Sequence, residues 1–156
     1  MAAEESKPAS YFKWVRLKTK INSSCAMTKI SKTLRKMDFS QDNGNDIFYT
    51  VKSFVNAYNN LMESSGSSNE YDISHPEKFI KSLTKDQEDA LSDIGITISA
   101  SGKLKLDEDK LMETKPAKIG KLFSEDSEFT KKINFYANKI YRASNRIDVT
   151  LSLIHI

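Results

Sequence analysis

Residues 91–123 read LSDIGITISASGKLKLDEDKLMETKPAKIGKLF, and this stretch combines more position-specific structural signals than any other part of the chain. Gly95 follows a short helical pattern, at the point where a residue with positive φ commonly ends a helix. Residues 96–98 and 104–106 alternate apolar and polar side chains, and Ser101-Gly102 lies between them. Because a tight hairpin turn favours glycine at positive φ, these residues predict a two-stranded β-hairpin.

The second half of the stretch predicts two short helices. Asp107 can accept the free amide hydrogens in the first turn of a helix that passes through Leu111. Lys115-Pro116 ends this helix, because a proline disfavours helical backbone in the residue before it. An isolated hairpin is only marginally stable, so its apolar face must lie against helices. The residues that we expect to form this scaffold are Gly95, Gly102, Leu104, Leu106, Asp107, Leu111, Leu122 and Phe123.

Outside this stretch the sequence predicts three long amphipathic helices. Apolar residues recur every three or four positions from residue 10 to 37, from the Asn45-Asp46 cap to about residue 62, and from residue 128 to 147. In the first helix, Asn22-Ser23-Ser24 is a poor helix-forming patch and predicts a kink or break. We therefore expect a mainly α fold, with three long helices in a bundle or coiled-coil arrangement and a small inserted β-hairpin with short helices.

Two further short helices are predicted before the hairpin. Ser74 can cap a helix that contains Pro76 in its opening turn. Thr84 and Gln87 have the spacing of a capping box, in which a hydroxyl and an amide satisfy each other's backbone donors.

Length and composition favour one domain. The chain has 156 residues, of which 38% are hydrophobic and 29% charged, and its single cysteine excludes an internal disulfide framework. We expect a flexible arm at residues 1–9 and a single helical domain at residues 10–150, with the hairpin subdomain at 91–123.

The last six residues, LSLIHI at 151–156, are treated separately from the fold. The codons CTG TCT CTT ATA CAC ATC spell these residues, and that string resembles the transposon end used to prepare sequencing libraries. We expect a non-native, adapter-derived tail and a native chain that continues beyond Thr150.

The second and third long helices carry apolar seams with the spacing of coiled-coil core positions. Such a seam has two interpretations. It forms either the core of one chain or a contact between chains, and the sequence leaves both open. The residues that we expect to carry this packing or interaction are Phe54, Tyr58, Leu61, Phe129, Tyr136 and Ile140.

The charge distribution provides an alternative. Residues 11–37 hold eight basic side chains and no acidic one, in a chain whose net charge is only +3. Such a segment indicates either a surface for nucleic acid or an anionic lipid, or an ordinary solvated helix face. The absence of stacking aromatics and glycine loops among the lysines argues against nucleic acid. The candidate residues for an anionic partner are Lys29, Lys32, Arg35 and Lys36.

No pattern in the sequence indicates catalysis. His75 has no second native histidine or nearby cysteine with which to form a metal site or a catalytic pair. The neighbouring acids Asp107, Glu108 and Asp109 follow a helix-cap pattern, and the chain lacks a phosphate-binding glycine loop, zinc-ligand spacing and a nucleophile elbow. We expect no enzyme activity, no cofactor and no metal.

Two segments carry a family resemblance: VKSFVNAYNNL at residues 51–61 and, within residues 91–123, LSDIGITIS, SGKLKLDEDKL and IGKLF. They resemble the flagellar filament cap family, also called hook-associated protein two. The resemblance implies a compact relative of the family's helical C-terminal part. Full cap proteins are much longer and carry large β-rich domains, which have no counterpart between these segments.

The resemblance also implies a function. Cap proteins guide the insertion of subunits into a growing filament, form rings through helical regions and are not enzymes. It implies protein partners, either further copies of the chain or flagellin-like subunits. We find no secretory signal peptide and no membrane span. We expect either a cytoplasmic location or an extracellular one at a filament, reached by export without such a signal.

Overall fold

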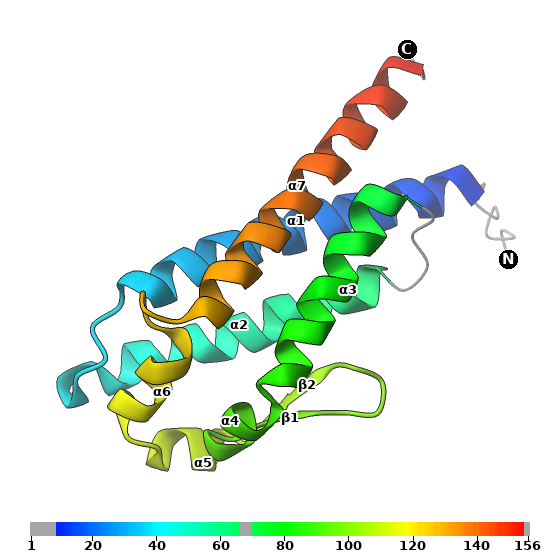
Figure 1. Ribbon diagram of the computed structural model, residues 1–156. Coiled ribbons are helices and arrows are strands. Elements are labelled where there is room, and N and C mark those ends of the chain that lie inside the picture. The colour runs from blue at the N-terminus through cyan, green and yellow to red at the C-terminus, as the bar shows by residue number, and fades with distance from the viewer. Residues whose placement is uncertain (1–8, 66–69, 155–156) are drawn as a thin grey trace, which may run out of the picture.

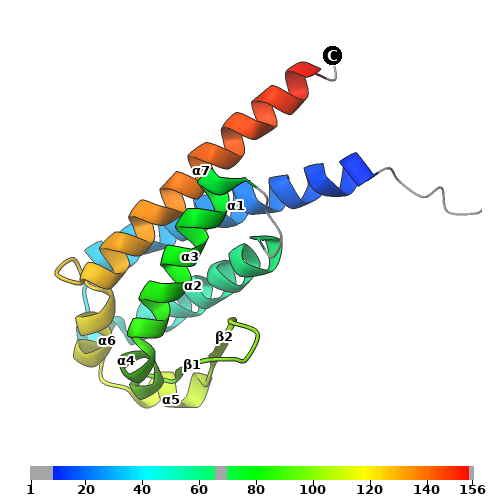
Figure 2. The same ribbon diagram turned by 45° about the vertical axis from the view of Figure 1, so that its right-hand side comes forward.

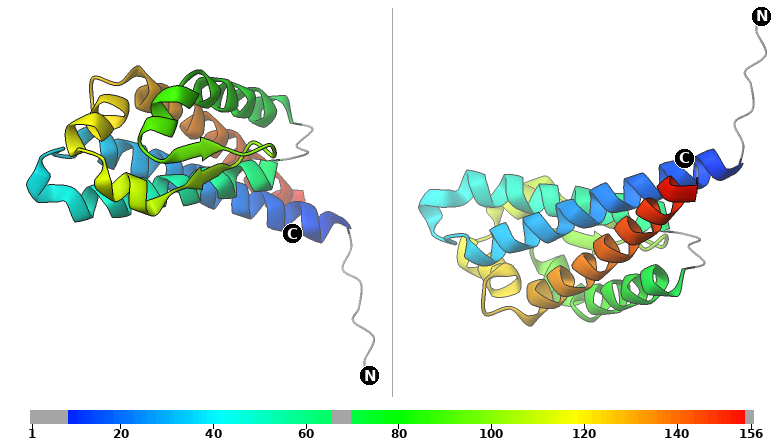
Figure 3. Two further views of the ribbon diagram at one scale, coloured as in Figure 1. Left: turned by 90° about the horizontal axis from the view of Figure 1, so that it is seen from below. Right: turned by 90° about the horizontal axis from the view of Figure 1, so that it is seen from above.

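The computed structural model describes residues 9–65 and 70–154, and most of them lie in four long helices. These helices are α1 (Ala9–Lys36), α2 (Gly44–Ser65), α3 (Tyr71–Asp86) and α7 (Glu128–Ile154). α1 packs against both α2 and α7, and α7 packs in turn against α3 (Figure 1). Seen from above, the N-terminal end of α1 and the C-terminal end of α7 lie at the same end of the molecule (Figure 3).

Short elements join α1 to α2 and α3 to α7. A 3₁₀ turn, η1 (Gln41–Asn43), precedes α2. After α3 follow α4 (Glu88–Asp93), the strands β1 (Ile96–Ile98) and β2 (Leu104–Leu106), α5 (Glu108–Glu113) and α6 (Pro116–Phe123). The predicted fold class, mainly α with a small hairpin, is confirmed. The predicted arm lies mostly outside the described residues, and α7 continues to Ile154, through most of the segment interpreted as a tail.

The hairpin forms as predicted. β1 and β2 are antiparallel, with Ile96 opposite Leu106 and Ile98 opposite Leu104. Gly95 and Gly102 have φ values of +98° and +85°, in the left-handed region that favours glycine. The hairpin contacts α2 through β2 and lies below α2 and α3 in Figure 1.

The region between the connector and the hairpin differs from the prediction. The predicted helix around Pro76 is present, but α3 is longer and starts at Tyr71, so the predicted cap at Ser74 and the predicted short length are wrong. Pro76 lacks an amide hydrogen, but buried Ile73 and Ile80 on either side of it hold α3 against the bundle. The predicted capping box is also wrong, because Thr84 Oγ1 donates to the carbonyl of Ile80 at 2.8 Å.

α1 is not broken at Asn22-Ser23-Ser24. Ser23 Oγ and Ser24 Oγ donate to the carbonyls of Thr19 and Lys20, each at 2.7 Å. These hydroxyls therefore bond within the helix instead of competing with it, and α1 runs without interruption from Ala9 to Lys36.

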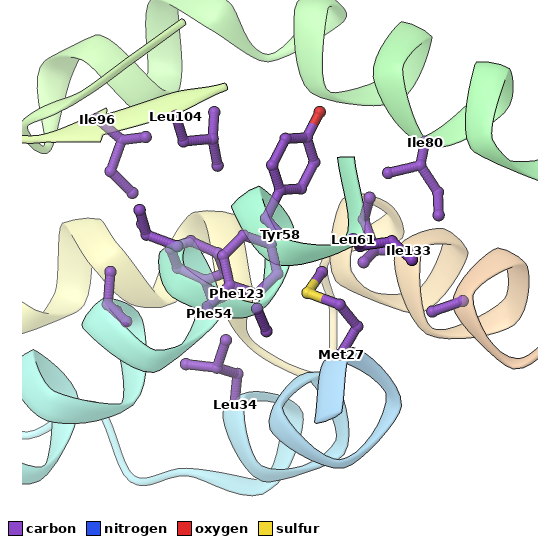
Figure 4. Close-up of a cluster of buried hydrophobic side chains, with 14 of the residues drawn as sticks. Met27, Leu34, Phe54, Tyr58, Leu61, Ile80, Ile96, Leu104, Phe123 and Ile133 are labelled. Atoms are coloured by element: carbon purple, nitrogen blue, oxygen red, sulfur yellow. The ribbon is translucent and has the colours of Figure 1, made fainter. Parts of the chain in front are cut away.

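The core lies where the hairpin and α6 meet the long helices. Figure 4 shows Ile96 and Leu104 of the hairpin facing Tyr58 of α2, with Phe54 and Phe123 beneath them. The ring centroids of Phe54 and Phe123 are 5.2 Å apart in an edge-to-face arrangement, which aromatic pairs favour. We call the segment from α4 to α6, residues 88–123, the wedge. It closes one end of the bundle.

Candidate functional site

The predicted seam residues lie mainly inside the chain. Five of the six, Phe54, Tyr58, Leu61, Phe129 and Ile140, are buried among their own helices. Tyr136 is half-buried, and its ring stacks on Phe79 of α3 with centroids 4.9 Å apart. These side chains fill the core, so a surface for partners has to come from other residues.

α1 and α7 project beyond the rest of the bundle (Figure 2), and both helices carry exposed apolar side chains there. Trp14 and Phe12 on α1 are 42% and 49% exposed, and Val149 on α7 is 52% exposed. Helical periodicity places Trp14 in the apolar stripe of α1, but the shorter helices α2 and α3 do not cover it. We call Tyr11, Phe12, Trp14, Val15 and Val149 the distal surface.

A second feature is a row of rings that runs from α3 to α7. Tyr71 stacks on His75 with centroids 4.8 Å apart, and His75 meets Phe79 edge to face at 4.8 Å. His75 is therefore part of an aromatic row. Among the described residues, no group of three or more potential metal ligands is found. No helix in residues 9–65 and 70–154 is long and apolar enough to cross a membrane.

Charged residues are buried between the helices near the distal surface. Lys20 Nζ of α1 lies 3.4 Å from Glu77 Oε1 of α3, and both side chains are only 6% exposed. Burial lowers the pKa of Lys20, and the carboxylate of Glu77 offsets part of this shift. Lys18 Nζ of α1 also bonds Asp148 Oδ2 of α7 at 2.7 Å. Sequence periodicity marked none of these pairs, because they join helices that are far apart in the chain.

The candidate basic residues lie near the C-terminal end of α1. Lys29, Lys32 and Lys36 are exposed, and Arg35 is half-buried. A groove between α1 and α7, with a volume of about 420 Å³, is lined by Lys32 and Arg35 and by additional residues of α7. α7 thus supplies basic residues that the segment 11–37 alone did not indicate.

The predicted scaffold residues occupy the wedge. Asp107 Oδ1 accepts a hydrogen bond from the backbone N–H of Lys110 at 3.2 Å, as expected for the cap of α5. Leu106 is half-buried, and Asp107 and Gly102 lie at or near the surface. The buried members of the scaffold are Gly95, Leu104, Leu111, Leu122 and Phe123.

Two further residues hold the wedge in place. Asn59 Nδ2 of α2 donates to the carbonyl of Leu104 at 2.8 Å, and Asn59 Oδ1 accepts from its N–H at 2.7 Å. The side chain of Asn59 thus pairs with β2 as a neighbouring strand would. A Cβ at Gly120 of α6 would lie 2.9 Å from the ring of Phe39, so glycine allows this ring to pack on α6.

Residues 77–152 match the family model of the flagellar hook-associated protein 2 C-terminus. This part of the chain, from within α3 to the last turns of α7, is therefore a region like the C-terminus of that protein. The match includes residues 91–123 and confirms the resemblance predicted from them, whereas residues 51–61 lie outside it. No curated protein and no solved structure matches the chain.

Proposed function

We propose that this chain is a non-enzymatic structural protein with a role like that of the flagellar filament cap, acting through contacts between its helices and those of other chains. The match of residues 77–152 to the C-terminal region of hook-associated protein 2 supports the cap-like role. The partners are further copies of the chain or flagellin-like subunits. The same match supports a site of action at a filament outside the cell.

The distal surface is the observation that carries the helix contacts. Isolated exposed apolar side chains are normal, whereas a group of them on two projecting helices indicates a protein contact. Tryptophan, tyrosine and phenylalanine bury much area for little lost conformational freedom, which makes them common anchors of interfaces. A partner helix laid across the start of α1 would cover Tyr11 and Trp14 together, because their ring centroids lie 6.4 Å apart.

Two of the three neighbouring acids of the wedge have structural partners, which supports the proposed lack of catalysis. Asp107 caps α5, and Glu108 lies 2.7 Å from Lys52 Nζ of α2. A general acid–base pair would need carboxylates that converge on a cleft with separated pKa values.

Light scattering coupled to size exclusion tests the proposal. We expect the wild-type chain to assemble as its concentration rises, and the variant Phe12→Ser/Trp14→Ser to remain monomeric. The matched control is Tyr49→Ser/Met112→Ser, which removes two side chains that are each 64% exposed elsewhere on the surface. A wild-type chain that stays monomeric at high concentration and does not bind flagellin-like subunits would refute the proposal.

A further inference from the structure

We propose that the groove between α1 and α7 binds an acidic peptide segment of a partner protein. α1 contributes Lys32 and Arg35 to this α1/α7 groove, and α7 contributes Lys131, Lys132, Asn134 and Phe135. The groove lies toward the C-terminal end of α1, away from the distal surface at the N-terminal end. The inference therefore adds a second contact site to the proposed function.

Charge is the first argument. Among the described residues, Glu128 is the only acidic one that lines the groove, against the four cations Lys32, Arg35, Lys131 and Lys132. Lys29 and Lys36 extend the basic surface along α1. Within residues 9–65 and 70–154, none of these six cations forms an ion pair. Their charges are uncompensated by the chain itself and attract an anionic ligand.

Hydrogen bonding is the second argument. The groove is lined by the donors Lys32 and Arg35 and by the side-chain amides of Asn134 and Asn138, each of which can both donate and accept a hydrogen bond. A peptide offers both complements, because its backbone N–H groups donate and its carbonyls and carboxylates accept. A phosphate chain offers acceptors only.

The apolar wall of the groove also fits a peptide. Phe135 is 54% exposed, and Lys139 Nζ lies 4.8 Å from its ring centroid. Single-stranded nucleic acids bind where several rings stack successive bases, and this groove offers one ring. A segment that alternates acidic and apolar side chains places carboxylates on the lysines and an apolar group on Phe135.

Fluorescence anisotropy with a labelled, glutamate-rich peptide that contains leucines tests this proposal on the full chain. We expect binding at low salt that weakens as salt is added, because the contacts are exposed charges. Lys131→Glu/Lys132→Glu should weaken binding about tenfold or more. This variant should fold, because acidic side chains near the start of α7 are favourable to its helix dipole.

Control variants show whether the loss of peptide affinity arises at the groove. Lys81→Glu/Lys85→Glu on α3 changes the net charge equally at exposed sites and should leave the affinity within about twofold. Phe135→Ala should weaken binding of the leucine-containing peptide but not of a version with serine in place of leucine. The distal-surface variant Phe12→Ser/Trp14→Ser should bind the peptide normally, which separates this inference from the proposed function.

Three results would overturn the inference. They are no binding at low salt, an equal loss of affinity in the α3 control, and stronger binding of single-stranded polyuridylate than of the peptide by the same residues. The last result would assign the groove to nucleic acid instead.

Discussion

The two ends of the helical bundle are packed by different chemistry. At the end closed by the wedge, Phe54, Phe123 and Phe129 form a buried cluster of rings. Toward the distal surface, the helices meet through the buried pair Lys20–Glu77 and the bond from Lys18 to Asp148. The first, which we call the wedge end, is packed by rings, whereas the second, the polar end, buries charge beside apolar side chains such as Leu17 and Ile73.

This difference gives the two ends different roles, since one stabilises the fold and the other fixes the positions of the helices. Removing apolar side chains from water is the main favourable term in folding, so the wedge end supplies most of the stability. A buried ion pair gains little net free energy, because desolvation offsets the attraction, but it is satisfied in one arrangement of α1 and α3 only. We therefore expect the wedge end to stabilise the fold and the polar end to position the helices that carry the distal surface.

The largest predicted effect is at the wedge end. Phe54→Ala removes a fully buried ring that contacts Phe123 and Phe129, and it should lower the free energy of unfolding by about 4 kcal/mol. Urea unfolding followed by circular dichroism measures the change. The control Phe135→Ala removes a ring that is 54% exposed and should cost less than about 1 kcal/mol. Equal losses in the two variants would contradict the comparison of the two ends.

The next largest effect is expected when the buried ion pair of the polar end is broken. Glu77→Ala leaves the buried ammonium of Lys20 without its carboxylate and should cost about 3 kcal/mol in the same unfolding measurement.

The double variant Lys20→Met/Glu77→Leu separates the net value of the pair from the cost of breaking it. It removes both charges and keeps apolar volume, so its stability should lie within about 1 kcal/mol of the wild type or above it. A double variant as unstable as Glu77→Ala would mean that the ion pair itself stabilises the bundle.

A smaller effect tests how the wedge is attached. Asn59→Ala removes both hydrogen bonds to the backbone of Leu104 and should cost about 2 kcal/mol. Asn60 is the next residue of α2 and is exposed, so Asn60→Ala serves as the matched control, with a change below about 0.5 kcal/mol. Hydrogen exchange of the Leu104 amide should speed up in the first variant only. Unchanged exchange there would exclude Asn59 as the anchor of the hairpin.

The same contrast shows which features could be predicted from the sequence. The wedge was predictable because its turns and caps depend on residues close together in the chain. Gly95 and Gly102 need positive φ locally, and Asp107 caps a helix that starts beside it. Sequence patterns identify such features because the residue that causes the turn or the cap lies within it.

The polar end and the groove were not predictable for the opposite reason. Lys20 and Glu77 are 57 residues apart in the chain, and Lys32 and Lys131 are 99 apart, so nothing local marks either combination. The start of α3 was placed too late, at Ser74, because proline is common in the first turn of a helix, whereas here buried Ile73 and Ile80 hold Pro76 inside a longer helix. Asn59 belonged to a recognised motif, but its pairing with β2 depends on where the wedge docks.

The smallest effect concerns pH, and it should have opposite signs at the two ends. Burial lowers the pKa of Lys20 below 10.5, so in the window below 10.5 the unfolded chain binds more protons, and stability rises with pH. Burial raises the pKa of Tyr58 above 10.0, partly offset by a hydrogen bond with Thr84. Here the folded chain keeps its proton longer, so stability falls as the pH rises above 10.0.

Urea midpoints measured from about pH 8 to pH 11 resolve the two contributions. Lys20→Met/Glu77→Leu should remove the rise and keep the alkaline fall, whereas Tyr58→Phe should keep the rise and remove the fall. Because the lysine pair and the tyrosine lie in different parts of the bundle, their effects should add. A pH profile that is unchanged in the double variant would mean that water reaches Lys20 and that the polar end is not closed.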